Sequence, residues 1–117
     1  MSNQETKIQQ EIRLALGRIK NLRLFRNETG QLPDPRTDRW VQFGLAKGSS
    51  DVIGFKTIKI TQDMVGDSVA QFVSIEVKTP KGRPTEIQKN WLQCIKSAGG
   101  ISGIARSIED AKKILDI

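Results

Sequence analysis

The sequence contains no histidine, and this absence removes several kinds of hydrolytic site. Ser-His-Asp triads, Cys-His pairs and zinc proteases of the His-Glu-x-x-His type all need an imidazole. Cys94 is the only cysteine, so disulfide frameworks and cysteine-based zinc sites are also excluded. Any hydrolytic chemistry in this chain must therefore use carboxylates, lysine and a metal ion.

Long apolar runs are also missing. No run approaches the ~18 residues that a membrane-spanning helix needs, and residues 1–5 are too polar and acidic for a signal peptide. With its single cysteine, the chain suits a reducing cytosol, and we expect no membrane partner. The 117 residues, 37% of them hydrophobic, fit one domain over residues 1–117 with one modest core.

Positive charge is in excess. The net charge is +6 and the isoelectric point is about 9.8. A basic surface favours a polyanionic partner, most often nucleic acid. Many small basic proteins bind nothing specific, so the charge alone does not decide the function.

The segment from Phe72 to Lys78 alternates apolar and polar residues, as a buried strand does. Its valines and isoleucine share one face, while Glu76 and Lys78 share the other with Ser74, about 7 Å apart along the strand. An acid and a base on such a strand are costly unless they are used. Glutamate can bind a hard divalent cation, and a nearby lysine can steer or deprotonate water. The alternative is a cross-strand salt bridge on a half-exposed sheet.

Helical periodicity is clear over residues 3–18. The apolar stripe consists of Ile8, Ile12, Ala15, Leu16 and Ile19. Glu5 falls inside this stripe one turn earlier, and Glu11 falls near its edge. An inward-facing carboxylate in a first turn is unusual, although the helix dipole alone would favour an acid there.

The middle of the chain predicts short strands and turns. We expect a strand over 22–26, a turn over 27–30, and a mobile loop over 31–39 that contains two prolines. After an apolar segment over 41–45, a tight turn over 47–51 ends in Asp51. A strand from Asp51 to Ile60 and a return over 69–78 predict a hairpin that brings Asp51 and Glu76 close together.

The last third of the sequence has strong local signals. A basic turn over 79–84 precedes Thr85, which with Gln88 forms a Thr-x-x-Gln capping box at the start of a helix. Gly99-Gly100 ends that helix, a short strand follows over 101–105, and a final helix covers 107–115. The predicted buried face of the first of these helices consists of Ile87, Trp91, Cys94, Ile95 and Ala98. The order of elements indicates an α/β or α+β sheet flanked by helices.

Glu5, Asp51, Glu76 and Lys78 together form a pattern that resembles the PD-(D/E)xK nuclease superfamily. The resemblance is closest to the VRR-NUC family in its small, phage-type, stand-alone form, and it covers nearly the whole chain. The motifs that carry it are Glu5-Thr6-Lys7-Ile8-Gln9, Arg26-Asn27-Glu28-Thr29-Gly30, Lys47-Gly48-Ser49-Ser50-Asp51-Val52-Ile53-Gly54, Glu76-Val77-Lys78, Gly82-Arg83-Pro84-Thr85-Glu86-Ile87-Gln88-Lys89-Asn90-Trp91-Leu92 and Ala98-Gly99-Gly100.

This resemblance implies an α/β fold with a PD-(D/E)xK restriction-endonuclease-like core, in which a mixed β-sheet is flanked by α-helices. Oxygen ligands favour Mg²⁺ or Mn²⁺ over zinc. Asp51 and Glu76 are the expected ligands, and the family adds the Val77 carbonyl. Glu5 is expected to bind directly, through water or at a second metal, with Glu11 as the alternative acid.

Lys78 is expected to orient or deprotonate the attacking water. Gln88 is expected both to cap its helix and to contact the site. Four basic residues are candidates for phosphate contacts or, taken singly, ordinary solvated charges: Lys47, Lys81, Arg83 and Arg26.

The expected function is a metal-dependent, structure-selective DNA endonuclease. The resemblance implies a homodimer that resolves Holliday junctions, located in the cytoplasm of a bacterial host as a phage or prophage protein. One alternative is a monomeric nuclease for flaps or other branched DNA. Another is a non-catalytic basic DNA-binding protein on a nuclease fold, although the intact set of acids and lysine argues against it.

Overall fold

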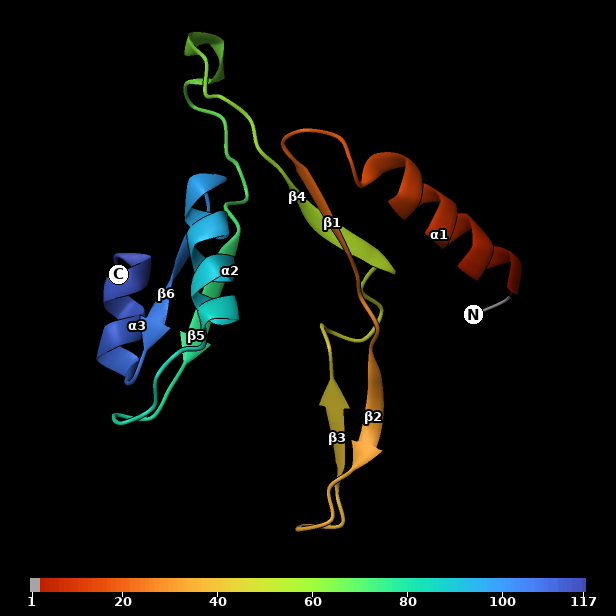
Figure 1. Ribbon diagram of the computed structural model, residues 1–117, viewed down its shortest axis with the longest axis vertical. Coiled ribbons are helices and arrows are strands. Elements are labelled where there is room, and N and C mark those ends of the chain that lie inside the picture. The colour runs from red at the N-terminus through yellow and green to blue at the C-terminus, as the bar shows by residue number, and fades with distance from the viewer. Residues whose placement is uncertain (1–2) are drawn as a thin grey trace. The chain divides into compact units, whose positions relative to one another are not determined.

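The structure, a computed structural model, describes residues 3–117 and divides into two compact units, Met1–Lys56 and Thr57–Ile117 (Figure 1). The elements of the first unit are α1 (Asn3–Leu16), β1 (Leu22–Arg26), β2 (Gly30–Pro33), β3 (Trp40–Phe43) and β4 (Val52–Lys56). Those of the second unit are the 3₁₀ turn η1 (Gln62–Met64), β5 (Val73–Val77), α2 (Glu86–Ser97), β6 (Ile101–Ala105) and α3 (Ile108–Leu115). The predicted mixed α/β class is confirmed. Over residues 3–117, no helix is long and apolar enough to cross a membrane.

In the first unit, β1 and β4 form an antiparallel pair, and α1 packs against β1. The register places Leu24 opposite Gly54. The two backbones approach so closely there that a Cβ on Gly54 would lie 1.8 Å from the carbonyl oxygen of Arg23. Only glycine allows this approach without a shift of the strands. The pair is therefore fixed at Gly54, three residues after Asp51.

Strands β2 and β3 form a second antiparallel pair, so the predicted loop over 31–39 is wrong for residues 31–33, which lie in β2, and holds only for the turn over 34–39. The turn that joins them is organised by Asp34. Its backbone N–H donates to the carbonyl of Arg39 at 2.7 Å, and its carboxylate accepts from the backbone N–H of Arg36 at 2.9 Å. An aspartate that bonds the backbone two residues on is a common turn device. It confines the irregular segment to a short tip between the strands.

In the second unit, β5 and β6 form a parallel pair joined by α2 (Figure 1). The hydroxyl of Ser102 in β6 donates to the carbonyl of Leu92 in α2 at 2.6 Å, which places α2 on one face of the pair. A Cβ on the adjacent Gly103 would lie 2.8 Å from Ile114 in α3, which places α3 on the opposite face. The two strands thus lie between two helices.

The strand partners differ from the predicted hairpin of 51–60 with 69–78. Strand β4 pairs with β1, and β5 pairs with β6. Strand β4 ends at Lys56 rather than Ile60, and β5 begins at Val73 rather than Val69. The segment between them contains η1, where the Thr61 hydroxyl donates to Asp63. This local turn lies in the gap between the two predicted strands, and the residues on either side of it, 57–60 and 69–72, belong to no strand.

The buried face of α2 is shifted from the predicted stripe. Ile95 is buried as predicted, with 1% of its surface exposed, but its buried partner is Leu92. Ile87 is 81% exposed, and Cys94 is also exposed. The indole N–H of Trp91 donates to the Ser74 hydroxyl at 2.8 Å. This bond holds the ring near β5, so the helix turns Leu92 and Ile95 towards β6.

Candidate active site

Glu76 and Lys78 are half-buried at the carboxyl end of β5. Side chains alternate along a strand, so both belong to the face that carries Ser74. Because Ser74 accepts a hydrogen bond from Trp91, this face is the one that α2 covers. Within the described residues, neither Glu76 nor Lys78 belongs to an ion pair. The structure therefore gives no support to the salt-bridge alternative for this acid and this lysine.

The backbone of Val77 points to the edge of β5 that faces away from β6. In a parallel pair, successive residues direct their backbone groups to opposite edges. Phe72 accepts from the N–H of Ile101, and Lys78 donates to the carbonyl of Ala105, so these even-numbered residues face β6. Val77 faces the other way, and its carbonyl oxygen is not used in the β5–β6 ladder.

Gln88 takes part in the predicted capping box of α2, which is confirmed. The Thr85 hydroxyl accepts from the Gln88 backbone N–H at 3.1 Å, and the Gln88 side-chain oxygen accepts from the Thr85 backbone N–H at 2.9 Å. Both orphan donors at the helix start are thereby satisfied. Over residues 3–117 no hydrogen bond is found for the side-chain amide nitrogen of Gln88, so it can still act as a donor.

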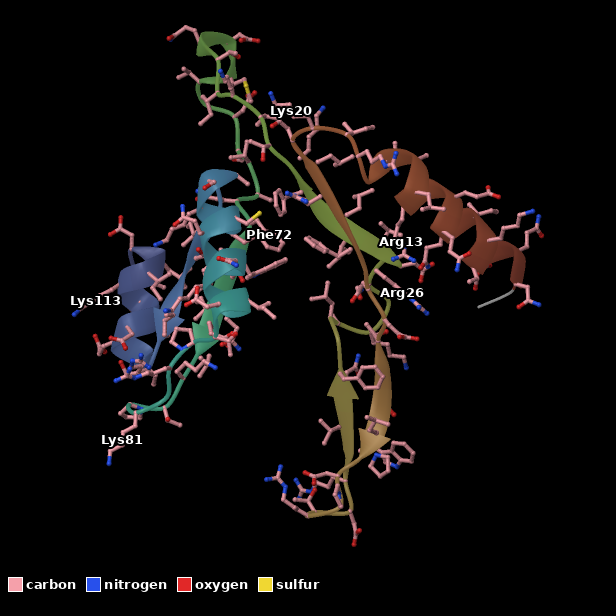
Figure 2. All side chains as sticks on the ribbon, in the orientation of Figure 1. Arg13, Lys20, Arg26, Phe72, Lys81 and Lys113 are labelled. Atoms are coloured by element: carbon pink, nitrogen blue, oxygen red, sulfur yellow. The ribbon has the colours of Figure 1, made fainter. Side chains whose placement is uncertain are left out.

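The predicted basic turn between β5 and α2 is also found. The Gly82 N–H donates to the Thr79 carbonyl at 3.0 Å, which closes a β-turn with Pro80 and Lys81 at its centre. Lys81 and Arg83 are exposed. Figure 2 shows Lys81 at the tip of the turn, with its side chain directed away from the helices. No acid occurs between Glu76 and Glu86 in the sequence, so this turn is uniformly positive.

In the first unit, Glu5 and Asp51 line the same pocket, which has a volume of about 230 Å³. Its other lining residues are Ile8, Gln9, Ile12 and Val52. Glu5 is thus the acid of α1 that shares a pocket with Asp51, and Glu11 does not line it. Gln9 is 7% exposed and is the buried residue of the helix, while Ile8 and Ile12 remain partly exposed along the pocket.

Asn27 is a residue whose role the sequence did not reveal. Its side-chain amide donates to the Ser49 hydroxyl at 2.7 Å and to the Ser50 carbonyl at 2.9 Å. Its backbone N–H donates to the Asp51 carbonyl at 2.8 Å. Asn27 therefore holds the turn that presents Asp51. The sequence feature that could have drawn attention to Asn27 is its place in the Arg-Asn-x-x-Gly motif. The motif does not indicate which residues Asn27 contacts.

The other two basic candidates lie in the first unit. Arg26 ends β1 and makes an exposed ion pair with Glu28, 3.3 Å between nitrogen and oxygen (Figure 2). An exposed pair of this kind contributes little stability, so Arg26 can exchange Glu28 for another anion. Lys47 is exposed in the turn that precedes Asp51.

The predicted site residues are thus divided between the two units. Glu5 and Asp51 lie in the first unit, whereas Glu76, Lys78 and Gln88 lie in the second. Within the described residues of each unit, no three potential metal-binding side chains lie close enough together to hold a metal ion. The donors that are present are carboxylate and carbonyl oxygens, and this set suits a hard divalent cation.

These features are those of a nuclease: an acid and a lysine beside a basic turn in the second unit, two acids on one pocket in the first, and an excess of positive charge on an α/β chain. Compared with models of protein families, the chain matches the VRR-NUC domain over residues 3–109, which spans both units. The chain belongs to the VRR-NUC family, and it is a nuclease domain whose substrate is DNA. No curated protein and no solved structure matched it.

Proposed function

We propose that this protein is a metal-dependent endonuclease that cuts branched DNA, and that residues 1–117 act as one nuclease domain with a PD-(D/E)xK core. The observation that carries the proposal is the pair Glu76 and Lys78, half-buried on one strand face and outside any ion pair over residues 3–117. A half-buried acid and lysine that form no ion pair within the described part of the chain point to use by a ligand. The family match over 3–109 supports a nucleic acid as that ligand.

The donor set fits Mg²⁺ or Mn²⁺. Asp51 and Glu76 are the proposed carboxylate ligands, and the Val77 carbonyl, unused in the β5–β6 ladder, is a third. Glu5 would bind directly, through water or at a second metal. When bound, the cation supplies charge stabilisation at the phosphorus and lowers the pKa of the attacking water.

The chain's own residues have separate tasks in this proposal. Lys78 orients the attacking water or accepts its proton. Gln88 uses its oxygen for the helix cap and has its amide nitrogen for a contact at the site. Lys81 and Arg83, in the exposed turn after Lys78, neutralise backbone phosphates. In the first unit, Arg26 and Lys47 are proposed for the same task.

We further propose a homodimer that makes paired cuts in a four-way junction. Each chain supplies a single set of catalytic residues, and an isologous dimer matches the two-fold symmetry of such a junction. The register of β2 and β3 places Leu32, Val41 and Phe43 on one face, and all three are exposed, as is Leu45 nearby. An exposed apolar face of this kind favours a protein partner, for which we propose a second copy.

A cleavage panel tests the proposal. Purified protein is incubated with synthetic four-way junction, flap, duplex and single-stranded DNA, each with Mg²⁺ or Mn²⁺, while light scattering at micromolar concentration gives the oligomeric state. We expect a dimer that makes symmetric nicks in the junction in preference to the flap. A monomer that cuts flaps better would replace the resolvase by a flap nuclease. DNA binding with no cleavage under any condition would replace the enzyme by a DNA-binding protein.

A further inference from the structure

Arg106 is the residue that follows β6, and it contacts the basic turn that follows β5. One guanidinium nitrogen, Nη1, donates to the carbonyl of Thr79 at 3.1 Å and to the carbonyl of Gly82 at 2.9 Å. Nη1 carries two N–H groups, so the two bonds use its donors fully. The two acceptors are the first and last residues of the β-turn, whose tip is Lys81.

The position of Arg106 is itself fixed by its surroundings. Its backbone N–H donates to the Asp110 carboxylate at 2.9 Å, which ties it to the first turn of α3. The preceding residue, Ala105, accepts from the Lys78 N–H at 3.0 Å, so the ends of β5 and β6 are locked side by side. The guanidinium thus reaches the turn from a fixed backbone position, at the same end of the unit as Lys78.

The turn needs such an anchor. Between Lys78 and Thr85 the backbone is restrained by the rings of Pro80 and Pro84 and by the Gly82 bonds to the Thr79 carbonyl and hydroxyl. The charges of Lys81 and Arg83 repel one another, and this repulsion opposes a compact conformation. Hydrogen bonds from a charged donor to two carbonyls oppose this tendency and are stronger than neutral ones.

We propose that Arg106 is a positioning residue for DNA binding: it holds the turn over 79–84 so that Lys81 and Arg83 are presented to backbone phosphates. This inference rests on the proposed function. A lysine ammonium ends one bond closer to its own Cα than Nη1 does and is carried on a flexible stem, so we expect it not to hold both carbonyls from this position. Arg106→Lys therefore removes the anchor while the net charge of the protein is unchanged.

Two measurements on intact Arg106→Lys protein test the inference. The first is limited trypsin digestion. The rate of cleavage at the Lys81–Gly82 bond measures how often the turn opens, and the rate at sites in α2 measures how often the fold opens. The Arg83–Pro84 bond is resistant to trypsin. We expect about tenfold faster cleavage after Lys81, from the loss of hydrogen bonds with a charged donor, and no change in α2. The second is the affinity for junction DNA at 0.1 M salt. Loss of one phosphate contact weakens binding about eightfold there, given a salt slope of about 0.9 per contact.

Two further variants separate position from charge. Pro80→Gly loosens the turn without touching a charged residue, and we expect it to reproduce both effects. Lys113→Ala removes one exposed charge from α3 and should leave cleavage after Lys81 unchanged (Figure 2). Single-turnover cleavage at saturating protein should stay within about twofold in Arg106→Lys, because binding rather than chemistry is affected.

The outcomes distinguish this inference from the proposed function. If the wild-type protein binds and cuts DNA but Arg106→Lys equals it in affinity, Arg106 does not position the turn for DNA. If Arg106→Lys shows no faster cleavage after Lys81, the anchor itself is refuted. If the wild-type protein neither binds nor cuts any DNA, the proposed function fails, and the trypsin result still decides whether Arg106 holds the turn.

Discussion

Asn27→Asp is the substitution that best tests how the structure presents Asp51. It keeps the shape of the side chain but replaces the donor amide with a carboxylate that donates nothing. The bond to the Ser50 carbonyl is lost, because a carbonyl can only accept, whereas the Ser49 hydroxyl can turn and donate to the new carboxylate. The backbone bond to the Asp51 carbonyl can remain. The carboxylate also faces the Ser50 carbonyl oxygen and repels it. The turn before Asp51 should therefore loosen.

The magnitude follows from the contact with the Ser50 carbonyl. The lost hydrogen bond is worth about 1 kcal/mol net, and the carbonyl then faces a carboxylate instead of a donor, which costs about as much again. We therefore expect a loss of about 2 kcal/mol in the free energy of unfolding. For a chain of this length, that loss corresponds to a decrease of about 6–10 °C in Tm. DNA cleavage should fall at least about tenfold, because small misplacements of a catalytic group are costly. DNA affinity should change much less.

The matched control is Asn90→Asp. It also replaces an amide with a carboxylate and lowers the net charge of the protein by one, but at an exposed position of α2. A surface substitution of this kind should change stability by less than about 0.5 kcal/mol. Thermal unfolding, DNA binding and single-turnover cleavage of both variants give the comparison. If Asn27→Asp matched Asn90→Asp in stability and the wild-type protein in cleavage, Asn27 would not position Asp51.

Three other predictions concern the proposed active site. Glu76→Gln and Lys78→Ala should each reduce cleavage at least about 100-fold with normal circular dichroism and DNA binding; loss of folding instead would favour a structural role. Thr85→Ala should lower the free energy of unfolding by about 1 kcal/mol in thermal unfolding without reducing cleavage. Gln88→Ala should reduce cleavage more than it reduces stability. If the two variants had equal cleavage activity, Gln88 would serve only as a helix cap. Cleavage assays should show turnover with Mg²⁺ or Mn²⁺ and binding without turnover in Ca²⁺, and full activity in excess chelator would contradict a metal mechanism.

Local signals in the sequence predicted much of the second unit. Thr85 and Gln88 marked the start of α2, and Ser107 marked the start of α3; both hydroxyls accept the expected backbone N–H. Strand alternation put Glu76 on the face of Ser74, which the bond from Trp91 identifies as the face of α2. Each of these features depends on residues a few positions apart, so a pattern in the sequence is enough to reveal it.

Features that depend on distant residues were harder to predict. Pro33 and Asp34 suggested a loop, although the loop is only the tip of the β2–β3 pair. The pairing of β4 with β1 requires knowledge of which strand meets which, and alternation does not contain that information. For the same reason the contacts of Asn27 and Arg106 were missed, because their partners lie 22 to 27 positions away in the sequence.

The face shared by Glu76 and Lys78 limits how the length of this strand can vary. A deletion or insertion of one residue within Val73–Val77 would turn every side chain that follows it to the opposite face. The acid and the lysine would then point to α3, and Val77 would point to α2. A change of two residues restores the faces. Viable length variants of this strand should therefore differ by even numbers of residues, whereas segments outside the strands have no such constraint.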